Sequence, residues 1–454
     1  MSGSKKRART LKAALKPNTP TPKCNDIEDL DFGKEQIVEI RECLLEWYDR
    51  NQRDLPWRRI SIEDLEKRAY AVWVSEVMLQ QTRVQTVVDY FNRWMDKWPT
   101  IYHLSTASIE LVNQIWAGLG YYRRARFLLE GAKMIVEEGG EFPKTVPALR
   151  KVKGIGDYTA GAIASIAFNE VVPVVDGNVV RVIARLKAIS ANPKDKVTVN
   201  TFWKLAGELV DSCRPGDFNQ ALMELGATIC TPLSPKCSSC PISSQCQAFS
   251  LTQHKESASV TDYPSKVIKP KQRHEWCAVT VVETQIAQEL GLESSSKFLL
   301  VKRPNKGLLA GLWEFPSVIL ETETDLTVRR EAVDKFMKSS LTLDHRKDYK
   351  ILLREDVGEY IHVFSHIRLK MYIELLVLEV KDMKGKRSVS LKPHNIESVE
   401  WKYVDNQELT SMGLTSGVRK VYSMVQKYKE SKLSSTSSSS GAKKNAGARK
   451  ASKS

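Results

Sequence analysis

Apolar residues recur at three- and four-residue spacing through the first half of the chain, from Gln36 to about Phe249. This period places apolar side chains on one face of an α-helix. The pattern predicts helices over residues 37–48, 84–98, 108–116, 125–136, 159–167 and 201–210. No convincing alternating strand interrupts them, so we expect an all-α domain over residues 34–250.

The apolar period changes from about 3.6 to 2 after a polar linker over residues 251–273. Alternating or β-branched residues predict strands. The predicted strands cover residues 276–284, 298–303, 359–365 and 370–380, and helical patterns cover 326–338 and 417–428. We therefore expect a second, α+β domain over residues 274–430.

Both ends of the chain are polar and basic, and we expect them to be disordered. Residues 1–33 begin with seven Lys or Arg before the first acid, and residues 431–454 contain six Lys or Arg and no acid. The net charge of +15 therefore lies mostly in the tails. DNA binding must accordingly be argued from motifs, and the tails add only unspecific attraction.

The chain has neither an apolar run long enough to span a bilayer nor the apolar core of a secretory signal. We expect an intracellular protein with no membrane association. The basic run from Lys5 to Arg9 predicts nuclear import. A mitochondrial address stays open, because no acid precedes Asp26.

Gly154 and Gly156 precede an apolar helix, and Asp176 follows about twenty residues later beside a glycine. Two glycines allow a tight hairpin whose backbone N–H groups can hold a phosphate. Asp176 would then project from a helix start as a candidate reactive carboxylate. An ordinary helix–helix turn and a simple helix cap are the alternatives. At this spacing the combination resembles the helix-hairpin-helix DNA glycosylases.

Glu76 is the one carboxylate among large apolar residues of a predicted helix. Desolvation favours the neutral acid, so Glu76 is a candidate general acid. Its alternative place is the wet side of the helix. Gln81 follows on the same segment, and Tyr121 and Tyr122 adjoin three arginines after a glycine turn, a composition suited to base stacking. A solvated basic helix start is the competing interpretation.

Four cysteines lie within seventeen residues, with three prolines that break helix: Cys230, Cys237, Cys240 and Cys246. Four thiolates at such spacing can bind one metal centre, and spacing alone leaves tetrahedral zinc open. The spacing at the end of a helical domain resembles the four-iron four-sulfur loop of the endonuclease III and adenine glycosylase branch. Cys277 stands alone, so we predict no second metal site.

The segment from Lys302 to Pro316 resembles the opening of a Nudix fold. Nudix hydrolysis needs a following helix with several metal-binding glutamates. The sequence after Arg330 and Glu331 lacks the paired glutamates and the glycine, which leaves Mg²⁺ too few oxygen ligands. We therefore expect a recognition domain without hydrolysis.

These motifs, in this order, resemble the MutY family of adenine DNA glycosylases in its eukaryotic form, over about residues 36–430. The resemblance implies removal of adenine paired with 8-oxoguanine, and also with guanine, from double-stranded DNA. It implies that Glu76 is the general acid, that Asp176 stabilises the positive sugar, and that Tyr158 and Asn178 support them. It also implies that Gln81, with Tyr121 or Tyr122, inserts into the base stack and that Phe364, Ser365 and His366 read 8-oxoguanine. Phe364 to His366 taken alone would be an ordinary strand end.

The resemblance further implies one four-iron four-sulfur cluster and no nucleotide cofactor, and we expect a monomer. Downstream repair proteins are not readable from the sequence. Three other functions are alternatives: a glycosylase/lyase like endonuclease III, a Nudix hydrolase with a DNA-binding domain, and a silent lesion-binding protein. Tyr158 stands where the lyase has its nucleophilic lysine, the Nudix helix is incomplete, and both Glu76 and Asp176 are present.

Overall fold

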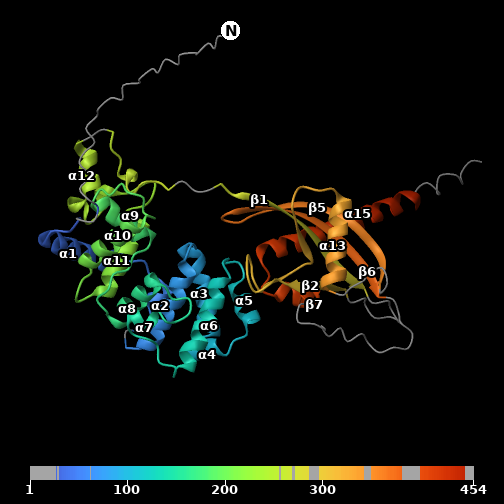
Figure 1. Cartoon of the computed structure of the whole chain (residues 1–454), viewed down its shortest axis with the longest axis horizontal. Helices are drawn as coiled ribbons and strands as arrows, with labels where there is room; N and C mark the ends of the chain where they lie inside the picture. Colours follow the sequence, from blue (N-terminus) through green and yellow to red (C-terminus); the bar gives the residue numbers. More distant parts are fainter. Residues whose placement is uncertain are drawn as a thin grey trace, which may run out of the picture. The chain divides into compact units, whose positions relative to one another are not determined.

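The structure of the protein is a computed structural model. The structure describes residues 27, 30–61, 63–254, 257–267, 271–285, 296–341, 349–380 and 399–444. The chain divides into two compact units, one from Met1–Gln52 with Val171–Val267 and the other from Arg53–Glu170 with Ile268–Ser454. Figure 1 labels helices and strands of both units. The expected single helical domain is thus shared between two units. In the described residues no helix is long and apolar enough to cross a membrane.

The first unit is helical and joins one early helix to the later ones. Its elements are α1 (Lys34–Asn51), α9 (Gly177–Leu186), α10 (Lys196–Leu209), α11 (Pro215–Thr228), η3 (Cys237–Ser239), η4 (Ser243–Gln245), α12 (Gln247–His254) and η5 (Val260–Asp262). Ile40 and Leu44 of α1 pack in one core with residues of α9, α10 and α11. Burial of these apolar faces therefore holds together segments more than a hundred residues apart.

Two boundaries expected from the sequence are wrong. Phe32 is buried in the core of the first unit, and its N–H donates to Glu208 Oε2 at 2.9 Å, so ordered packing begins before residue 34. Helix α12 continues to His254, and Val260 of the expected linker is buried as well. In both places an isolated apolar residue in a polar stretch is buried by tertiary contacts, which no local sequence pattern indicates.

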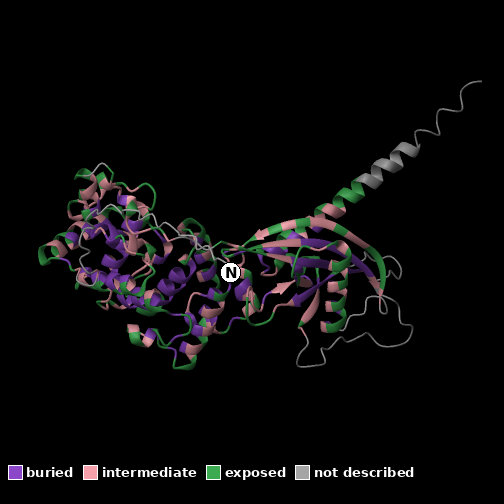
Figure 2. Ribbon diagram, turned by 45° about the horizontal axis from the view of Figure 1, so that its top comes forward, coloured by how far each residue is buried: buried purple, intermediate pink, exposed green. Residues whose placement is uncertain are grey.

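The helical part of the second unit surrounds α2 and α8. Its elements are η2 (Pro56–Arg58), α2 (Leu65–Leu79), α3 (Val84–Lys97), α4 (Ile101–Ser105), α5 (Ile109–Trp116), α6 (Arg123–Glu137), α7 (Val146–Leu149) and α8 (Asp157–Phe168). Helix α2 is buried all round from Ala69 to Met78, and α8 is buried from Thr159 to Ala167. The alanines and glycine of α8 allow α2 to approach closely, and Glu76 of α2 is buried. Buried residues are purple in Figure 2 and lie mostly in the interior of the helical part.

The rest of the second unit is a mixed sheet of order β3-β2-β1-β6-β5, with β4 paired to β1 and β7 to β2. The strands are β1 (Arg273–Gln285), β2 (Lys297–Lys302), β3 (Trp313–Glu314), β4 (Ser317–Leu320), β5 (Tyr349–Val363), β6 (Ile367–Val380) and β7 (Trp401–Asp405). Strands β1 and β6 pair in parallel, from Arg273 opposite Ile367 onward.

Helices cover both faces of this sheet, and the alternation of β1 assigns its side chains to them. Cys277, Val279 and Val281 pack with α14 (Asn406–Ser411) and α15 (Ser416–Lys444). Ala278 and Val282 pack with α13 (Leu326–Ser340) on the other face. The expected α+β domain is confirmed.

Helix α15 continues past the domain end expected at residue 430, which is a further correction. Lys429 Nζ bonds both carboxylate oxygens of the buried Glu283, at 2.8 and 2.6 Å. Lys432 contacts Glu355 of β5. These ion pairs connect α15 to the sheet at Lys429 and Lys432, which follow the end of the predicted helical pattern at residue 428.

Candidate active site and metal-binding loop

Glu76 lies in the middle of α2 and is only 6% exposed. The hydroxyl of Tyr158 in the first turn of α8 donates a short hydrogen bond to Glu76 Oε2. The alternative place of Glu76 on the wet side of its helix is therefore wrong. The structure brings two of the predicted site residues into direct contact from segments 82 positions apart.

The predicted hairpin connects α7 to α8. Gly154 has φ of +88°, and a Cβ there would lie 2.5 Å from Cβ of Phe127, so both backbone conformation and space require glycine. Gly156 is the N-cap of α8, has extended backbone, and a Cβ would meet nothing within 4 Å. The hairpin thus leads directly into the start of α8, whose first turn contains Tyr158.

Asp176 is the N-cap of α9 in the other unit, as the sequence predicted. Its Oδ1 accepts from the N–H of Asn178 and of Val179, at 2.9 and 2.7 Å, and its Oδ2 accepts from the Asn178 amide at 2.8 Å. Burial raises the pKa of Asp176 above its ordinary value, and these hydrogen bonds oppose the shift. The Asp176 carboxylate is thus fixed in one orientation by Asn178, which is itself one of the predicted site residues.

Arg181 connects Asn178 to the cysteine loop, which the sequence analysis missed. Its guanidinium donates to Asn178 Oδ1 at 2.8 Å, to the Gly226 carbonyl at 2.6 Å and to the Cys230 carbonyl at 2.7 Å. A Cβ on Gly226 would lie 2.6 Å from Cβ of Asn178, so this glycine permits the close approach of α11 to α9. The spacing of Asn178 and Arg181 on one helix face was the available signal.

The four predicted ligands, Cys230, Cys237, Cys240 and Cys246, line one small cavity. Burial raises the pKa of the Cys240 thiol to about 12 and that of Cys246 to about 11. Arg185 donates to Cys230 Sγ at 3.2 Å. Among the described residues no three His, Cys, Asp or Glu side chains are placed to hold a single metal ion.

Two of the predicted stacking residues are on the surface in an unusual backbone conformation. Gln81 follows the end of α2 with φ of 57°, and Tyr121 precedes α6 with φ of 48° and is 48% exposed. Tyr122 is only 8% exposed. Of the two tyrosines that the sequence left open, Tyr121 has the accessible ring.

The predicted lesion-reading residues form the turn between β5 and β6. The N–H of Phe364 donates to the Ile367 carbonyl at 2.8 Å, which leaves Ser365 and His366 exposed at the tip. The Ser365 hydroxyl lies 3.1 Å from His366 Nδ1. Gln272, which the sequence analysis did not single out, donates to the Phe364 carbonyl at 2.8 Å and holds the turn.

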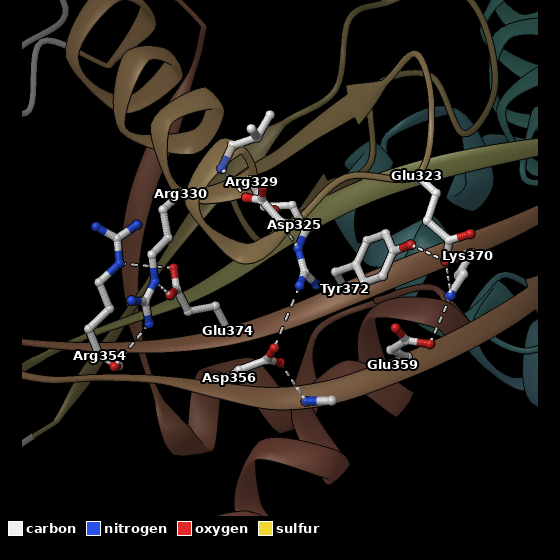
Figure 3. A network of polar contacts seen from close by, with 12 residues as sticks. Glu323, Asp325, Arg329, Arg330, Arg354, Asp356, Glu359, Lys370, Tyr372 and Glu374 are labelled. Atoms are coloured by element: carbon white, nitrogen blue, oxygen red, sulfur yellow. Dashed lines mark hydrogen bonds and ion pairs between the residues drawn. The ribbon is translucent and has the colours of Figure 1, made fainter.

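The carboxylates beside α13 are occupied by arginines (Figure 3). Arg330 donates to Glu374 at 2.5 Å, and Arg354 donates to Glu374 at 3.0 Å and to Asp334 at 3.0 Å. Guanidinium groups therefore neutralise these carboxylates, whereas Mg²⁺ requires several free oxygen ligands. The absence of Nudix hydrolysis stays a prediction.

Comparison with known proteins decides the family. Residues 74–208 match the family described as HhH-GPD superfamily base excision DNA repair protein, and residues 290–424 match the NUDIX domain. An adenine DNA glycosylase of Arabidopsis thaliana is 56% identical over 87% of this chain and 65% of its own length. Those of Mus musculus and Homo sapiens are 40% and 41% identical, over 87% and 86% of this chain and 79% and 74% of theirs.

The chain belongs to the adenine DNA glycosylase family. Membership confirms the predicted family and the predicted order of a helix-hairpin-helix domain followed by a Nudix-like domain. The chain spans less than two thirds of the length of the Arabidopsis adenine DNA glycosylase. The individual site residues are predictions that these matches do not test.

Proposed function

We propose that this protein hydrolyses the N-glycosidic bond of adenine paired with 8-oxoguanine, and also with guanine, in double-stranded DNA. The observation that carries the proposal is the enclosed carboxyl of Glu76 bonded to Tyr158. A carboxyl group with few water neighbours is suited to deliver a proton to a leaving group. Family membership supports adenine as that leaving group.

The roles of the chain's carboxyl groups follow from what the bond cleavage requires. Adenine is first flipped out of the stack, and Glu76 protonates its nitrogen 7, so that the base leaves as a neutral group. The carboxylate of Asp176, oriented by Asn178, offsets the positive charge that develops on the sugar. Water then completes the hydrolysis.

Tyr158 supports hydrolysis without lyase chemistry. A lyase of this superfamily forms a Schiff base, which requires an amine nucleophile. The position in the first turn of α8 holds a phenol, and its hydroxyl is engaged with Glu76. We therefore assign Tyr158 to orienting the general acid.

Recognition of the opposite base is assigned to the turn of Phe364, Ser365 and His366. Its polar groups are exposed at a tip fixed by the β5–β6 hairpin and by Gln272. Normal guanine and 8-oxoguanine differ at position 8 and the adjoining nitrogen, so one or two hydrogen bonds suffice to distinguish them. Gln81 and Tyr121, from the helical part, are proposed to fill the stack from which adenine departs.

A four-iron four-sulfur cluster is the proposed cofactor of the cysteine loop, and we propose no nucleotide cofactor. The donor set fits it, because four thiols line one cavity. A single zinc ion needs its sulfur ligands at about 2.3 Å from one centre. A four-iron four-sulfur cluster is held by four thiolates, and the loop offers four cysteines around one cavity. When bound, the cluster would hold the loop rigid against α9 and α11.

We propose duplex DNA with these mispairs as the partner, and a monomer that acts in the nucleus. The supporting basic run from Lys5 to Arg9 lies outside the described residues. A mitochondrial share remains part of the proposal, and imaging of the tagged full chain in cells tests it. Exclusion from both nucleus and mitochondria would overturn this assignment.

Single-turnover cleavage of duplexes with adenine opposite 8-oxoguanine, guanine, cytosine and thymine tests the activity. We expect adenine release opposite 8-oxoguanine and guanine, without strand scission until the abasic site is treated with base. Equal release from all four duplexes would contradict the proposed specificity. Scission without base treatment would instead support the lyase alternative.

A further inference from the structure

Gln81 and Tyr121 share a backbone conformation that is unfavourable for residues with side chains. Both are exposed and both have left-handed φ, 57° and 48°. Such residues persist where the surroundings fix them, and they cluster at functional sites. The two residues lie on separate segments, one after α2 and one before α6.

One buried side chain, that of Arg124, bonds the peptide groups leading into both residues. Its Nη1 donates to the Gln80 carbonyl at 2.5 Å, and its Nη2 donates to the Gly120 carbonyl at 3.2 Å. These carbonyls directly precede Gln81 and Tyr121 in the chain. The same guanidinium therefore bonds the peptide group on the N-terminal side of each left-handed residue.

Further contacts of Arg124 anchor it to each segment. On one side Nη1 donates to the carbonyls of Val77 and Met78, at 2.9 and 3.0 Å, and Nη2 donates to the Thr82 hydroxyl at 3.3 Å. On the other side Nη2 donates to the Leu119 carbonyl at 3.2 Å. The guanidinium carbon also lies 5.5 Å from the centre of the Tyr121 ring. This set of bonds ties the last turn of α2 to the loop before α6.

A guanidinium group is suited to bonding acceptors on two segments at once, and a lysine ammonium is not. Arg124 is only 8% exposed, and all six of its acceptors are neutral oxygens. Burial lowers its pKa to about 10, so the group is still charged at neutral pH. A planar guanidinium reaches acceptors on two sides at once, whereas a lysine ammonium is a single point of charge.

We propose that Arg124 is a positioning residue that keeps Gln81 and Tyr121 at one fixed spacing, so that both side chains enter the base stack together. The inference rests on the proposed function for the role of these two residues. The inference adds that Gln81 and Tyr121 insert together because the buried Arg124 holds both of them. Loss of Arg124 should therefore remove the contribution of both side chains to DNA binding.

The test is a double-mutant cycle in the full-length holoenzyme. Arg124→Met and Arg124→Lys are each made alone and combined with Gln81→Ala and with Tyr121→Ala. Ile135→Ala is the matched control, because Ile135 is buried on the same helix, α6, and contacts neither segment through a hydrogen-bonding side chain. Two quantities are measured for each variant. The first is the affinity for a duplex with adenine opposite 8-oxoguanine. The second is the fluorescence of 2-aminopurine placed beside the mispair, because this fluorescence rises when the base is unstacked.

In the wild-type background Tyr121→Ala should weaken binding roughly 5- to 150-fold, the range for losing one stacked aromatic. In the Arg124→Met background the same substitution should change binding less than about 2-fold, because the paired insertion is already lost. Arg124→Lys should behave like Arg124→Met and should abolish the 2-aminopurine signal. If Arg124→Met does not fold, the lysine variant decides.

Three results would overturn the proposal: multiplicative effects of Arg124 and Tyr121 substitutions, full function of Arg124→Lys, or an equal loss in Ile135→Ala at a matched melting temperature. The second result would show that only positive charge matters. Failure of the proposed function has a different signature, since it is the absence of adenine release by the wild-type protein. The double-mutant cycle measures duplex binding, so it tests the role of Arg124 independently of adenine release.

Discussion

The Tyr158 hydroxyl donates a hydrogen bond to the buried carboxyl of Glu76, across the contact between α2 and α8. The bond fixes one carboxyl oxygen and so the direction in which the other can act. Because α2 and α8 are among the most buried helices of their unit, neither side chain can change place without disturbing the core. The acid and its orienting group are thus part of the fold itself.

Glu76→Gln should abolish adenine release at neutral pH, since an amide does not donate a mobile proton as a carboxylic acid does. Tyr158→Phe should lower the rate only about 2- to 12-fold, the range for losing one hydrogen bond to a neutral group, because Glu76 can still protonate the base. Single-turnover rates check both. Binding to the mispaired duplex is the control and should persist in each variant. Unchanged release by Glu76→Gln would remove Glu76 from the chemistry.

Asp176 provides a pH-dependent prediction. Its folded pKa is raised above 3.8, so its stabilising contribution is fully present below that pH and is lost as pH rises through the folded value. The melting temperature of Asp176→Asn minus that of the wild type should therefore increase as pH rises from about 4 to about 7. A flat difference across this range would mean that the pKa is not raised.

The rate of the same variant tests the electrostatic role. The ionised carboxylate is the form that offsets the sugar charge, so wild-type release should fall as pH drops through the raised pKa of Asp176. Asp176→Asn should lose more than about nine tenths of the rate at neutral pH, equivalent to about 1.4 kcal/mol or more. A variant that retains over a tenth of the rate would exclude Asp176 as the stabilising group.

Several features of the site could be predicted from local pattern. The helical period identified the segments that became α1, α3, α5, α6, α8 and α10, and the apolar setting of Glu76 predicted its burial. The glycine beside Asp176 predicted a helix start, and Asp176 is the N-cap. These features depend on residues near one another in sequence, where periodicity and capping act.

What escaped prediction depends on contacts between distant segments. Nothing local assigns α1 to the core of α9, α10 and α11, so the helical domain was expected as one unit. The six acceptors of Arg124 are mostly main-chain oxygens, which leave no mark in composition. The short strands β3, β4 and β7 were missed because two to five residues do not establish an alternation.

The arginine-occupied carboxylates of the Nudix-like domain should matter for its stability. Arg354 bonds Asp334 and Glu374, and all three side chains are less than 20% exposed. Arg354→Met should therefore destabilise the protein by about 3–5 kcal/mol, the usual result of removing one partner of a buried ion pair. Lys350→Met on the same strand is the matched control, because its pair with Glu379 is largely exposed and is worth about 0–1 kcal/mol. Equal losses in denaturant unfolding would contradict the distinction.

Protein purified without oxygen should be brown and contain about four irons per chain, because four cysteines line the cavity. Cys240→Ser should lower iron content and thermal stability together. Cys213→Ser, at an exposed cysteine outside the loop, is the control and should change neither. Stoichiometric zinc without iron in the wild type would overturn the cluster.

The turn of Ser365 and His366 should supply lesion discrimination without taking part in bond cleavage. Full-length protein with Ser365→Ala and His366→Ala should still release adenine, but its preference for 8-oxoguanine over guanine should fall by roughly 5- to 150-fold, corresponding to about 1–3 kcal/mol for unsatisfied partners. Gln272→Ala should give a smaller loss of preference, because it removes only the hydrogen bonds to the Phe364 and Ser365 carbonyls and leaves the side chains of the turn in place.

Binding and single-turnover rates for both duplexes must be compared at one fixed salt concentration, since the basic tails attract both equally. Arg368→Ala is a control at an exposed position just beyond the turn and should leave the preference unchanged. If the double substitution lowers both substrates by the same factor, or neither, the turn is structural. Recognition of 8-oxoguanine would then have to come from another part of the Nudix-like domain.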